Sequence, residues 1–173
     1  MTQHSALSKY AEAFRRLRKH RSAKTYPETV KGASPHKPLL LLAVLDIFSE
    51  AESNSNFITL DPELHALFTG YWLQVMPHDW HGDIGLPFFH LSREAFWHLQ
   101  PHFGSEYILR AGRRLISIKQ LHDHIAGAQL DDELFVLIRD ETARNALRTV
   151  LIETHFARET HDQLFAQGHV NQG

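Results

Sequence analysis

The sequence predicts a mainly α fold: a single compact helical domain with a central buried helix and a small antiparallel β-sheet. The first observation behind this prediction is the longest apolar run, residues 38–48, which is apolar nearly all round, as in a helix that neighbours surround. The second is a set of segments whose apolar residues recur at helical spacing. The third is a series of short apolar and aromatic segments between residues 86 and 110, which favours short strands.

The central helix is expected to begin at Pro38, because proline fits the first turn of a helix, and to end by about Glu50. His36 and Lys37 then stand at its N-terminus, where free backbone N–H groups and the helix dipole favour an anion. A basic pair at this end makes electrostatic sense if an external anion contacts both the basic side chains and the helix N-terminus. The alternative, a solvated helix start with incidental charge, stays open.

An apolar stripe at helical spacing predicts an amphipathic helix over 5–22, before the central helix. Arg18 and Arg21 fall where this stripe would continue, so this end of the helix is expected outside the core. It is either a solvated helix end or a row of cations that faces phosphates. The loop over 23–35 that follows is also basic and includes Lys31.

The next helix has a clear start signal, because Asp61 is a good N-cap and Pro62 fits the first helical position. It is expected to run to Val75, after a short extended segment over 57–60. A loop rich in His and Trp then leads to Gly85.

The small sheet is expected to pair an extended segment over 86–91 with an antiparallel partner over 95–99, across a turn at 92–94. Proline in such a strand belongs at a sheet edge, which applies to Pro87. A third short extended segment is expected over 107–110.

The C-terminal part of the chain is expected to be helical. Its helices are expected over 117–127, 130–139, 140–156 and 157–167. A flexible polar tail over 168–173 follows, so that the single domain covers residues 1–167.

Composition excludes several classes of protein. The 173 residues suffice for one domain with a real core, and 43% hydrophobic residues exclude wholesale disorder. The chain has no cysteine and no apolar signal core at its N-terminus, so we expect no disulfide and a cytoplasmic location. The apolar run is far shorter than the roughly 20 residues that span a bilayer, so no membrane segment is expected.

The formal net charge of −2 excludes a globally basic nucleic-acid binder, but the charge is uneven. Residues 1–45 carry nine Lys and Arg against two acids, whereas residues 120–173 carry four against nine. A basic face at one end is one form that a nucleic-acid footprint takes.

No catalytic site, cofactor or metal is predicted. The fourteen histidines match no metal-ligand spacing. His124, Asn145 and His155 imitate the order of residues in an HNH nuclease, whose histidine activates water and whose metal holds the phosphate. Such a site needs two strands between the first histidine and the asparagine, whereas residues 131–138 read as helix. An HNH-type DNA endonuclease therefore remains an alternative only.

Two anchors in the sequence resemble the sulfur-binding domain of McrA-like type IV, modification-dependent restriction endonucleases. The first anchor is SPHKPLLLL at 34–42, and the second is PFFHL at 87–91 followed by FWHL at 96–99. The segment NALRTVLIETHF at 145–156 also looks like the last helix of that domain. The resemblance covers roughly residues 7–160.

The resemblance implies a mainly helical fold and binding of duplex DNA in which sulfur replaces a non-bridging phosphate oxygen, in the natural Rp form. In the family, an apolar pocket for the sulfur is lined by a proline, the aromatic residue before it and a small residue three positions on. The matching residues here are Pro87, Leu86 and His90. The proline is kept, whereas the leucine is not aromatic and the histidine is not small.

The resemblance also implies a basic frame for the phosphates, formed by the basic pair of the first anchor and by an arginine after the sheet. The loop over 78–85 adjoins Pro87 and is the candidate for reading bases. The expected DNA-binding residues, with those of the basic N-terminal third, are His36, Lys37, Lys31, Arg18, Arg21, Arg110, Arg113, Arg114 and His81. Residues 110, 113 and 114 stay open as alternatives.

Family members usually carry an HNH nuclease after this domain. Because the sequence has no such motif, we expect a non-catalytic reader that works with a separate or fused HNH nuclease. A helical protein-interaction module, whose basic helix docks an acidic partner, is the remaining alternative.

Overall fold

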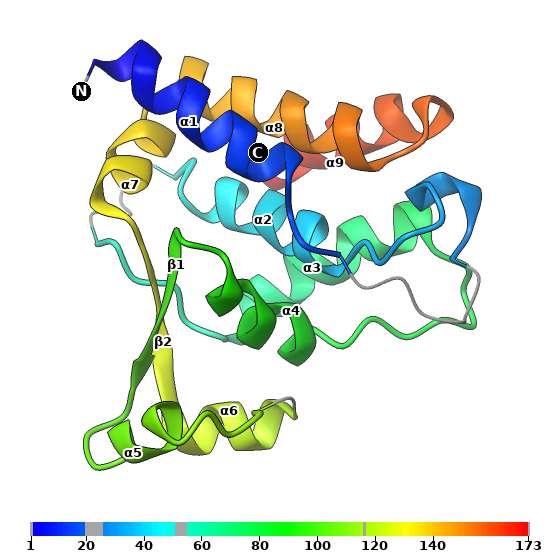
Figure 1. The fold of residues 1–173 in the computed structure, drawn as a ribbon. Coiled ribbons are helices and arrows are strands. Elements are labelled where there is room, and N and C mark those ends of the chain that lie inside the picture. Colours follow the sequence, from blue (N-terminus) through cyan, green and yellow to red (C-terminus); the bar gives the residue numbers. More distant parts are fainter. Residues whose placement is uncertain (1, 20–25, 51–54, 116, 173) are drawn as a thin grey trace.

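Helix α2 (His36–Ile47) lies at the centre of the fold, with the other helices of the larger part of the molecule around it (Figure 1). The structure, a computed structural model, describes residues 2–19, 26–50, 55–115 and 117–172. The remaining α-helices are α1 (Gln3–Arg15), α3 (Pro62–Val75), α4 (Gly85–His90), α5 (Glu106–Arg110), α6 (Ile118–His124), α7 (Asp132–Arg139), α8 (Glu141–His155) and α9 (His161–Gln172). The strands are β1 (Trp97–Pro101) and β2 (Ile125–Leu130), and short 3-10 helices are η1 (Glu28–Val30), η2 (Leu91–Arg93) and η3 (Arg158–Thr160).

The mainly α fold with a central buried helix and a small antiparallel sheet is confirmed. Ten of the twelve residues of α2 are buried, because α3, α4, α8 and α9 pack around it. The helix begins two residues before Pro38, with Pro35 as its N-cap, and ends at Ile47. His36 and Lys37 therefore form its first turn.

The start of α3 is as predicted, since the Asp61 Oδ1 atom accepts from the Leu64 N–H at 2.9 Å and Pro62 is the first helical residue. Helix α1 buries the apolar stripe that includes Tyr10 and Phe14. It ends at Arg15, earlier than predicted, so Arg18 lies in the segment that leads away from it.

The prediction of a strand over 86–91 is wrong, because these residues form α4 and the start of η2. The Asp83 Oδ1 atom accepts from the Gly85 N–H at 2.8 Å, and Pro87 needs no hydrogen-bonded N–H in the first turn. Phe88 is fully buried, and the Trp97 Nε1–H donates to its carbonyl at 3.0 Å. The segment over 107–110 is also helical and belongs to α5.

The sheet pairs β1 with β2, in an antiparallel register that runs from Trp97 opposite Leu130 to Pro101 opposite Ile125. The predicted helix over 117–127 therefore ends at His124 and continues as a strand. A Cβ atom on Gly127 would lie 2.5 Å from the Ile58 carbonyl oxygen. The glycine thus permits the close approach of a neighbouring segment to β2.

Helices α7 and α8 lie where they are predicted, but the last helix is longer than expected. Helix α9 continues to Gln172, so residues 168–172 are helical instead of a tail, and only Gly173 beyond them lies outside the described residues. The Asn171 Nδ2–H donates to the Asp46 Oδ2 atom of α2 at 2.8 Å, which ties this end of the chain to the core.

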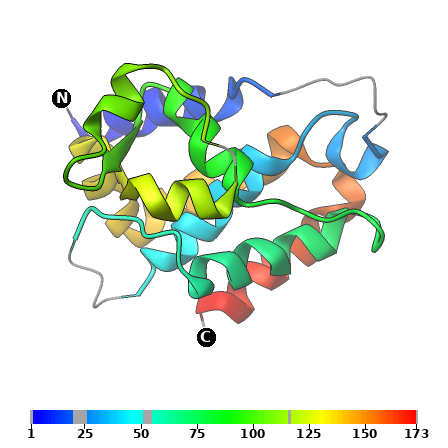
Figure 2. The same cartoon turned by 90° about the horizontal axis from the view of Figure 1, so that it is seen from below.

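Two parts of the molecule define the place of the candidate site. The helical body comprises α1, α2, α3, α7, α8 and α9, and the lobe comprises β1, β2, α5 and α6, which extend below it (Figure 1). Helix α4 packs against both α2 and α6, between these parts. Seen from below, the lobe covers one half of the body, and the loop between α3 and α4 runs along the other half (Figure 2).

Candidate nucleic-acid interface

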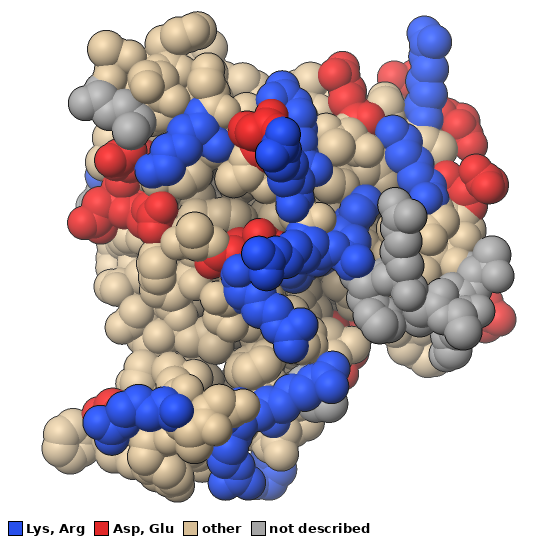
Figure 3. All heavy atoms as spheres, in the orientation of Figure 1, with Lys and Arg blue, Asp and Glu red and all other residues tan. Residues whose placement is uncertain are grey.

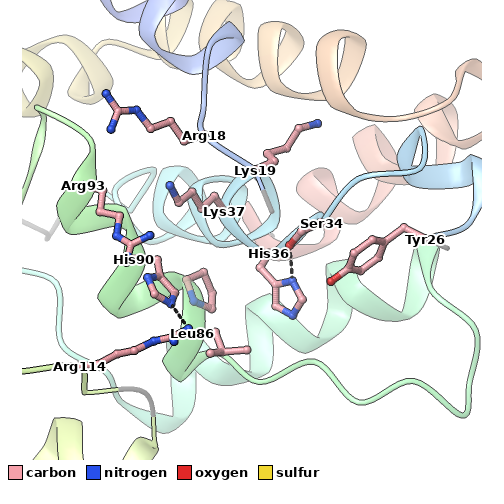
Figure 4. Close-up of a pocket in the computed structure, with 11 residues that line it drawn as sticks. Arg18, Lys19, Tyr26, Ser34, His36, Lys37, Leu86, His90, Arg93 and Arg114 are labelled. Carbon is pink, nitrogen blue, oxygen red and sulfur yellow. Dashed lines mark hydrogen bonds between the residues drawn. The ribbon is translucent and has the colours of Figure 1, made fainter. Parts of the chain in front are cut away.

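A cleft with a volume of about 380 Å³ opens where the first turn of α2 faces α4. The segments after α1 and α5 complete it, and Figure 4 shows side chains from all four regions around the same space. The residues that line the cleft are Arg18, Lys19, Tyr26, Ser34, His36, Lys37, Leu86, Pro87, His90, Arg93 and Arg114.

The apolar part of the cleft comes from α4. Pro87 is buried and Leu86 is half-buried, so they present ring and methyl carbons to the cleft. Phe88 anchors helix α4 to the core, because its side chain is fully buried and its ring centroid lies 5.4 Å from that of Trp97. This apolar floor is therefore fixed by the core.

His36 forms a polar wall of the cleft that is not charged at neutral pH. The pKa of His36 is lowered to about 4, chiefly by burial, while Asp83 raises it and His90 lowers it by smaller amounts. The imidazole shares a hydrogen bond with Ser34, with 2.7 Å between Nδ1 and Oγ, and its ring centroid lies 4.9 Å from that of Trp72. Of the predicted basic pair, His36 thus supplies hydrogen-bonding capacity in place of positive charge.

Lys37, the second member of that pair, is buried and already has an acidic partner. Its Nζ atom lies 2.9 Å from the Glu94 Oε1 atom, and the two side chains are 10% and 13% exposed. The same Oε1 atom accepts from the Arg18 backbone N–H at 3.0 Å. The carboxylate thus joins α2 to the segment after α1 and compensates the charge of Lys37.

Three exposed arginines at the mouth of the cleft, Arg18, Arg93 and Arg114, are called the rim arginines below. Within the described residues, none of them forms an ion pair with a carboxylate, although Arg114 Nη2 donates to His90 Nε2 at 3.4 Å. Some other surface cations are paired, among them Lys9 with Glu133 and Lys119 with Asp123. Figure 3 shows Lys and Arg side chains spread over this face from the body to the lobe.

The structure brings together seven of the residues predicted from the sequence. Those that line the cleft are Pro87, Leu86, His90, His36, Lys37, Arg18 and Arg114. Of the three arginines that follow β1, residue 114 is the one that reaches the cleft.

Other predicted residues lie elsewhere. Lys31 donates from Nζ to the carbonyl oxygens of Glu153 and Thr154, both at 3.1 Å, and so stabilises the end of α8. Arg110 and Arg113 are exposed on the lobe, with Arg113 beside a separate depression. His81 is exposed in the loop before α4, and Arg21 lies outside the described residues.

Four residues of the cleft were not predicted from the sequence: Lys19, Tyr26, Ser34 and Arg93. Arg93 was not predicted because the wrong strand prediction placed it in a hairpin turn. A helix over 86–91 would have placed it just beyond the apolar floor. Nothing in the local sequence singles out Tyr26, whose ring packs 5.5 Å from that of Trp80.

The nuclease alternative is not favoured, because its three residues do not meet. His124 ends α6 in the lobe, whereas Asn145 and His155 belong to α8 in the body (Figure 1). His155 is buried, and its Nε2–H donates to the Phe14 carbonyl at 2.7 Å. Among the described residues, no group of His, Asp and Glu side chains is arranged to hold a metal ion.

The fold and the cleft define a binding module for a polyanion, since arginines with no carboxylate partner among the described residues surround a small apolar floor on one basic face. A family model described as ScoMcrA-like, DNA sulfur-binding domain, matches residues 8–171. The chain belongs to this family, and its domain is a DNA-binding module and not a catalytic one. A search of curated proteins found no match. In the described part of the chain, no helix combines the length and apolar character that crossing a membrane requires.

Proposed function

We propose that the chain binds duplex DNA in which sulfur replaces one non-bridging phosphate oxygen, with the sulfur against Leu86 and Pro87. The observation that carries this proposal is that the apolar floor and the three rim arginines line one cleft, in a chain of the sulfur-binding-domain family. The arginines hold the modified phosphate and its neighbours, and the floor contacts the sulfur.

The floor discriminates between the two atoms because they differ in hydration and polarisability. A phosphate oxygen placed against carbon atoms loses its bound water without replacement, which is costly. Sulfur is larger, more polarisable and more weakly hydrated, so it loses less and gains more dispersion contact. A preference of about 10- to 100-fold is ordinary for one such pocket. The arginines contribute affinity and position but no sulfur preference.

His90 shapes the edge of the proposed sulfur pocket. It is half-buried, lines the cleft beside Pro87 and accepts from Arg114. The imidazole takes space where the family pattern has a small residue, so His90→Ala is expected to leave more room for the sulfur while it releases Arg114.

The loop before α4 is the proposed reader of bases. It is tied to the body, because the Trp72 Nε1–H donates to the Trp80 carbonyl at 2.9 Å and a Cβ atom on Gly82 would lie 2.6 Å from the Trp72 ring. His78 and His81 remain exposed on this anchored loop. They are the candidates on this loop for contacts with bases.

In this proposal the domain brings an HNH nuclease, separate or fused, to modified DNA. The domain itself cleaves nothing. Incubation of the chain with sulfur-modified plasmid and magnesium, manganese or nickel is expected to leave the plasmid intact, and nicking that disappears in His124→Ala would support the nuclease alternative instead.

A gel-shift comparison of two duplexes of identical sequence, one with a single Rp sulfur, tests the proposed function. We expect about 10- to 100-fold tighter binding of the sulfur duplex at equal salt concentration. Equal affinity for the two duplexes would refute the assignment of the cleft to sulfur. Absence of binding to either duplex at low salt would favour a protein-interaction module.

A further inference from the structure

An acidic side chain, Glu94, lies beside the basic rim of the cleft. Its Oε1 atom is bonded to both the Lys37 ammonium and the Arg18 backbone N–H, at 2.9 and 3.0 Å. A carboxylate next to a site for a polyanion is unfavourable for binding unless it has another role.

Glu94 acts on the cleft through Lys37. Lys37 lines the cleft, whereas Glu94 is not among the lining residues. Both side chains are largely buried, so their ion pair is less screened by solvent and salt than a surface pair. A ligand in the cleft therefore meets an ammonium group whose charge is compensated, next to arginines whose charge no described carboxylate compensates.

We propose that Glu94 sets the preference for sulfur over oxygen by withholding the Lys37 ammonium from the bound phosphate. This inference rests on the proposed function of the cleft. An oxygen pressed against the floor loses water and needs a hydrogen-bond donor in return. A free ammonium supplies such a donor in its strong, charged form. Because Glu94 takes one N–H of Lys37 and compensates its charge, the ammonium is a weaker partner for the oxygen, whereas the weakly hydrated sulfur depends less on such a partner.

Glu94→Gln tests this role, because the amide keeps the size of the side chain and can still accept from the Arg18 N–H, but it carries no charge. We expect the ordinary duplex to bind about tenfold more tightly, since it gains a charge-assisted contact with Lys37. The affinity for the sulfur duplex is expected to rise by less than about threefold. The preference for sulfur therefore falls, and the slope of log K against log salt for the ordinary duplex steepens by about 0.9.

Two controls separate this effect from a change in overall charge. Glu12→Gln removes the same charge from a carboxylate of α1 that pairs with Arg15 and Arg16 and is not part of the cleft lining. It is expected to change the affinity for both duplexes by one common factor. In the double variant Glu94→Gln with Lys37→Met, the gain of the ordinary duplex is expected to vanish, because the coupling runs through the ammonium.

Each result decides one question. If folded Glu94→Gln changes both affinities by the same factor, or raises the preference for sulfur, Glu94 does not set selectivity. If the unaltered protein binds both duplexes equally, the proposed function fails instead. Should circular dichroism show that Glu94→Gln does not fold, Lys37→Met replaces it: weaker binding of both duplexes with the preference intact is expected, and loss of the preference overturns the proposal.

Discussion

The interior of the helical body and the rim of the cleft both contain arginine, but its surroundings differ completely. In the interior, Arg148 Nη2 donates to Asp46 Oδ1 at 2.5 Å, with the two side chains 5% and 0% exposed. Asp46 also accepts from the Tyr71 hydroxyl and from Asn171. The rim arginines are exposed and have no carboxylate partner among the described residues. The body thus uses charge to join helices, while the cleft keeps charge available for a ligand.

Removal of the Asp46 carboxylate from the interior is expected to have the largest effect of the changes considered. Asp46→Ala is expected to lower the free energy of unfolding by about 3–5 kcal/mol, because it leaves Arg148 buried without its counter-charge. Urea denaturation measures the loss. Asp123→Ala breaks an exposed ion pair with Lys119 and should cause no measurable change. Equal stability of these two variants would contradict the assignment of a structural role to the interior network.

The pH dependence of stability is a second test of the role of buried polar groups in the interior. Burial lowers the pKa of His155 to about 4, below its usual value of 6.5. Between these values the unfolded chain takes up a proton on this imidazole and the folded chain does not. The free energy of unfolding is therefore expected to fall by about 3 kcal/mol as the pH decreases from 6.5 to 4, with a contribution to the slope that fades out about one pH unit above 6.5. His36, whose pKa is also lowered to about 4, adds a fall of the same sign.

His155→Gln isolates this effect, since an amide can donate to the Phe14 carbonyl and does not titrate. Unfolding free energies at several pH values should give a flatter curve for the variant than for the unaltered protein. Parallel curves would mean that protonation of His155 does not govern stability.

Pro87→Ser tests the apolar half of the cleft without touching the charges. The hydroxyl group adds polarity where the sulfur meets carbon, so the variant is expected to lose most of a preference of about 1–3 kcal/mol. Binding of the ordinary duplex should stay nearly unchanged. Leu86→Asn is expected to act in the same direction, more mildly. Binding constants for both duplexes are required, and a folded Pro87→Ser protein that keeps its full preference would place the sulfur elsewhere.

Arg93→Ala tests the charged half. Loss of one phosphate contact is expected to weaken both duplexes by a similar factor, about tenfold, and to reduce the slope of log K against log salt by about 0.9. Stability should hardly change, because the side chain is exposed and forms no ion pair with a described residue. Lys9→Ala removes a cation of α1 that is paired with Glu133 of α7, and it should leave both affinities nearly as they are. A selective loss for the sulfur duplex in Arg93→Ala would contradict the division of roles.

The central helix and the start of α3 could be predicted because their signals are local. An apolar run of this length can be buried only by surrounding neighbours, and Asp61 and Pro62 act within their own first turn. Basic and apolar residues of the cleft could likewise be predicted from the two sequence anchors. Only the fold, however, shows that Arg18, Pro87 and Arg114 line one cleft.

Helix α4 and strand β2 could not be predicted, because distant contacts decide their structure. The aromatic residues of α4 favour a strand locally, but burial of Phe88 against Trp97 and the hydrogen bond from the Gly85 N–H to Asp83 favour a helix. In β2, Gly127 faces the Ile58 backbone, a partner more than sixty residues away in sequence. The ion pair of Lys37 with Glu94 is similarly invisible in the sequence, since it joins separate elements.

Salt titration of the unaltered protein with the matched sulfur and ordinary duplexes tests the central claim most directly. If the rim arginines hold the phosphates and the apolar floor selects the sulfur, plots of log K against log salt should be steep, parallel and separated by about one to two log units. Coincident lines would show that the cleft does not distinguish sulfur, and flat lines would show that phosphates are not its ligand.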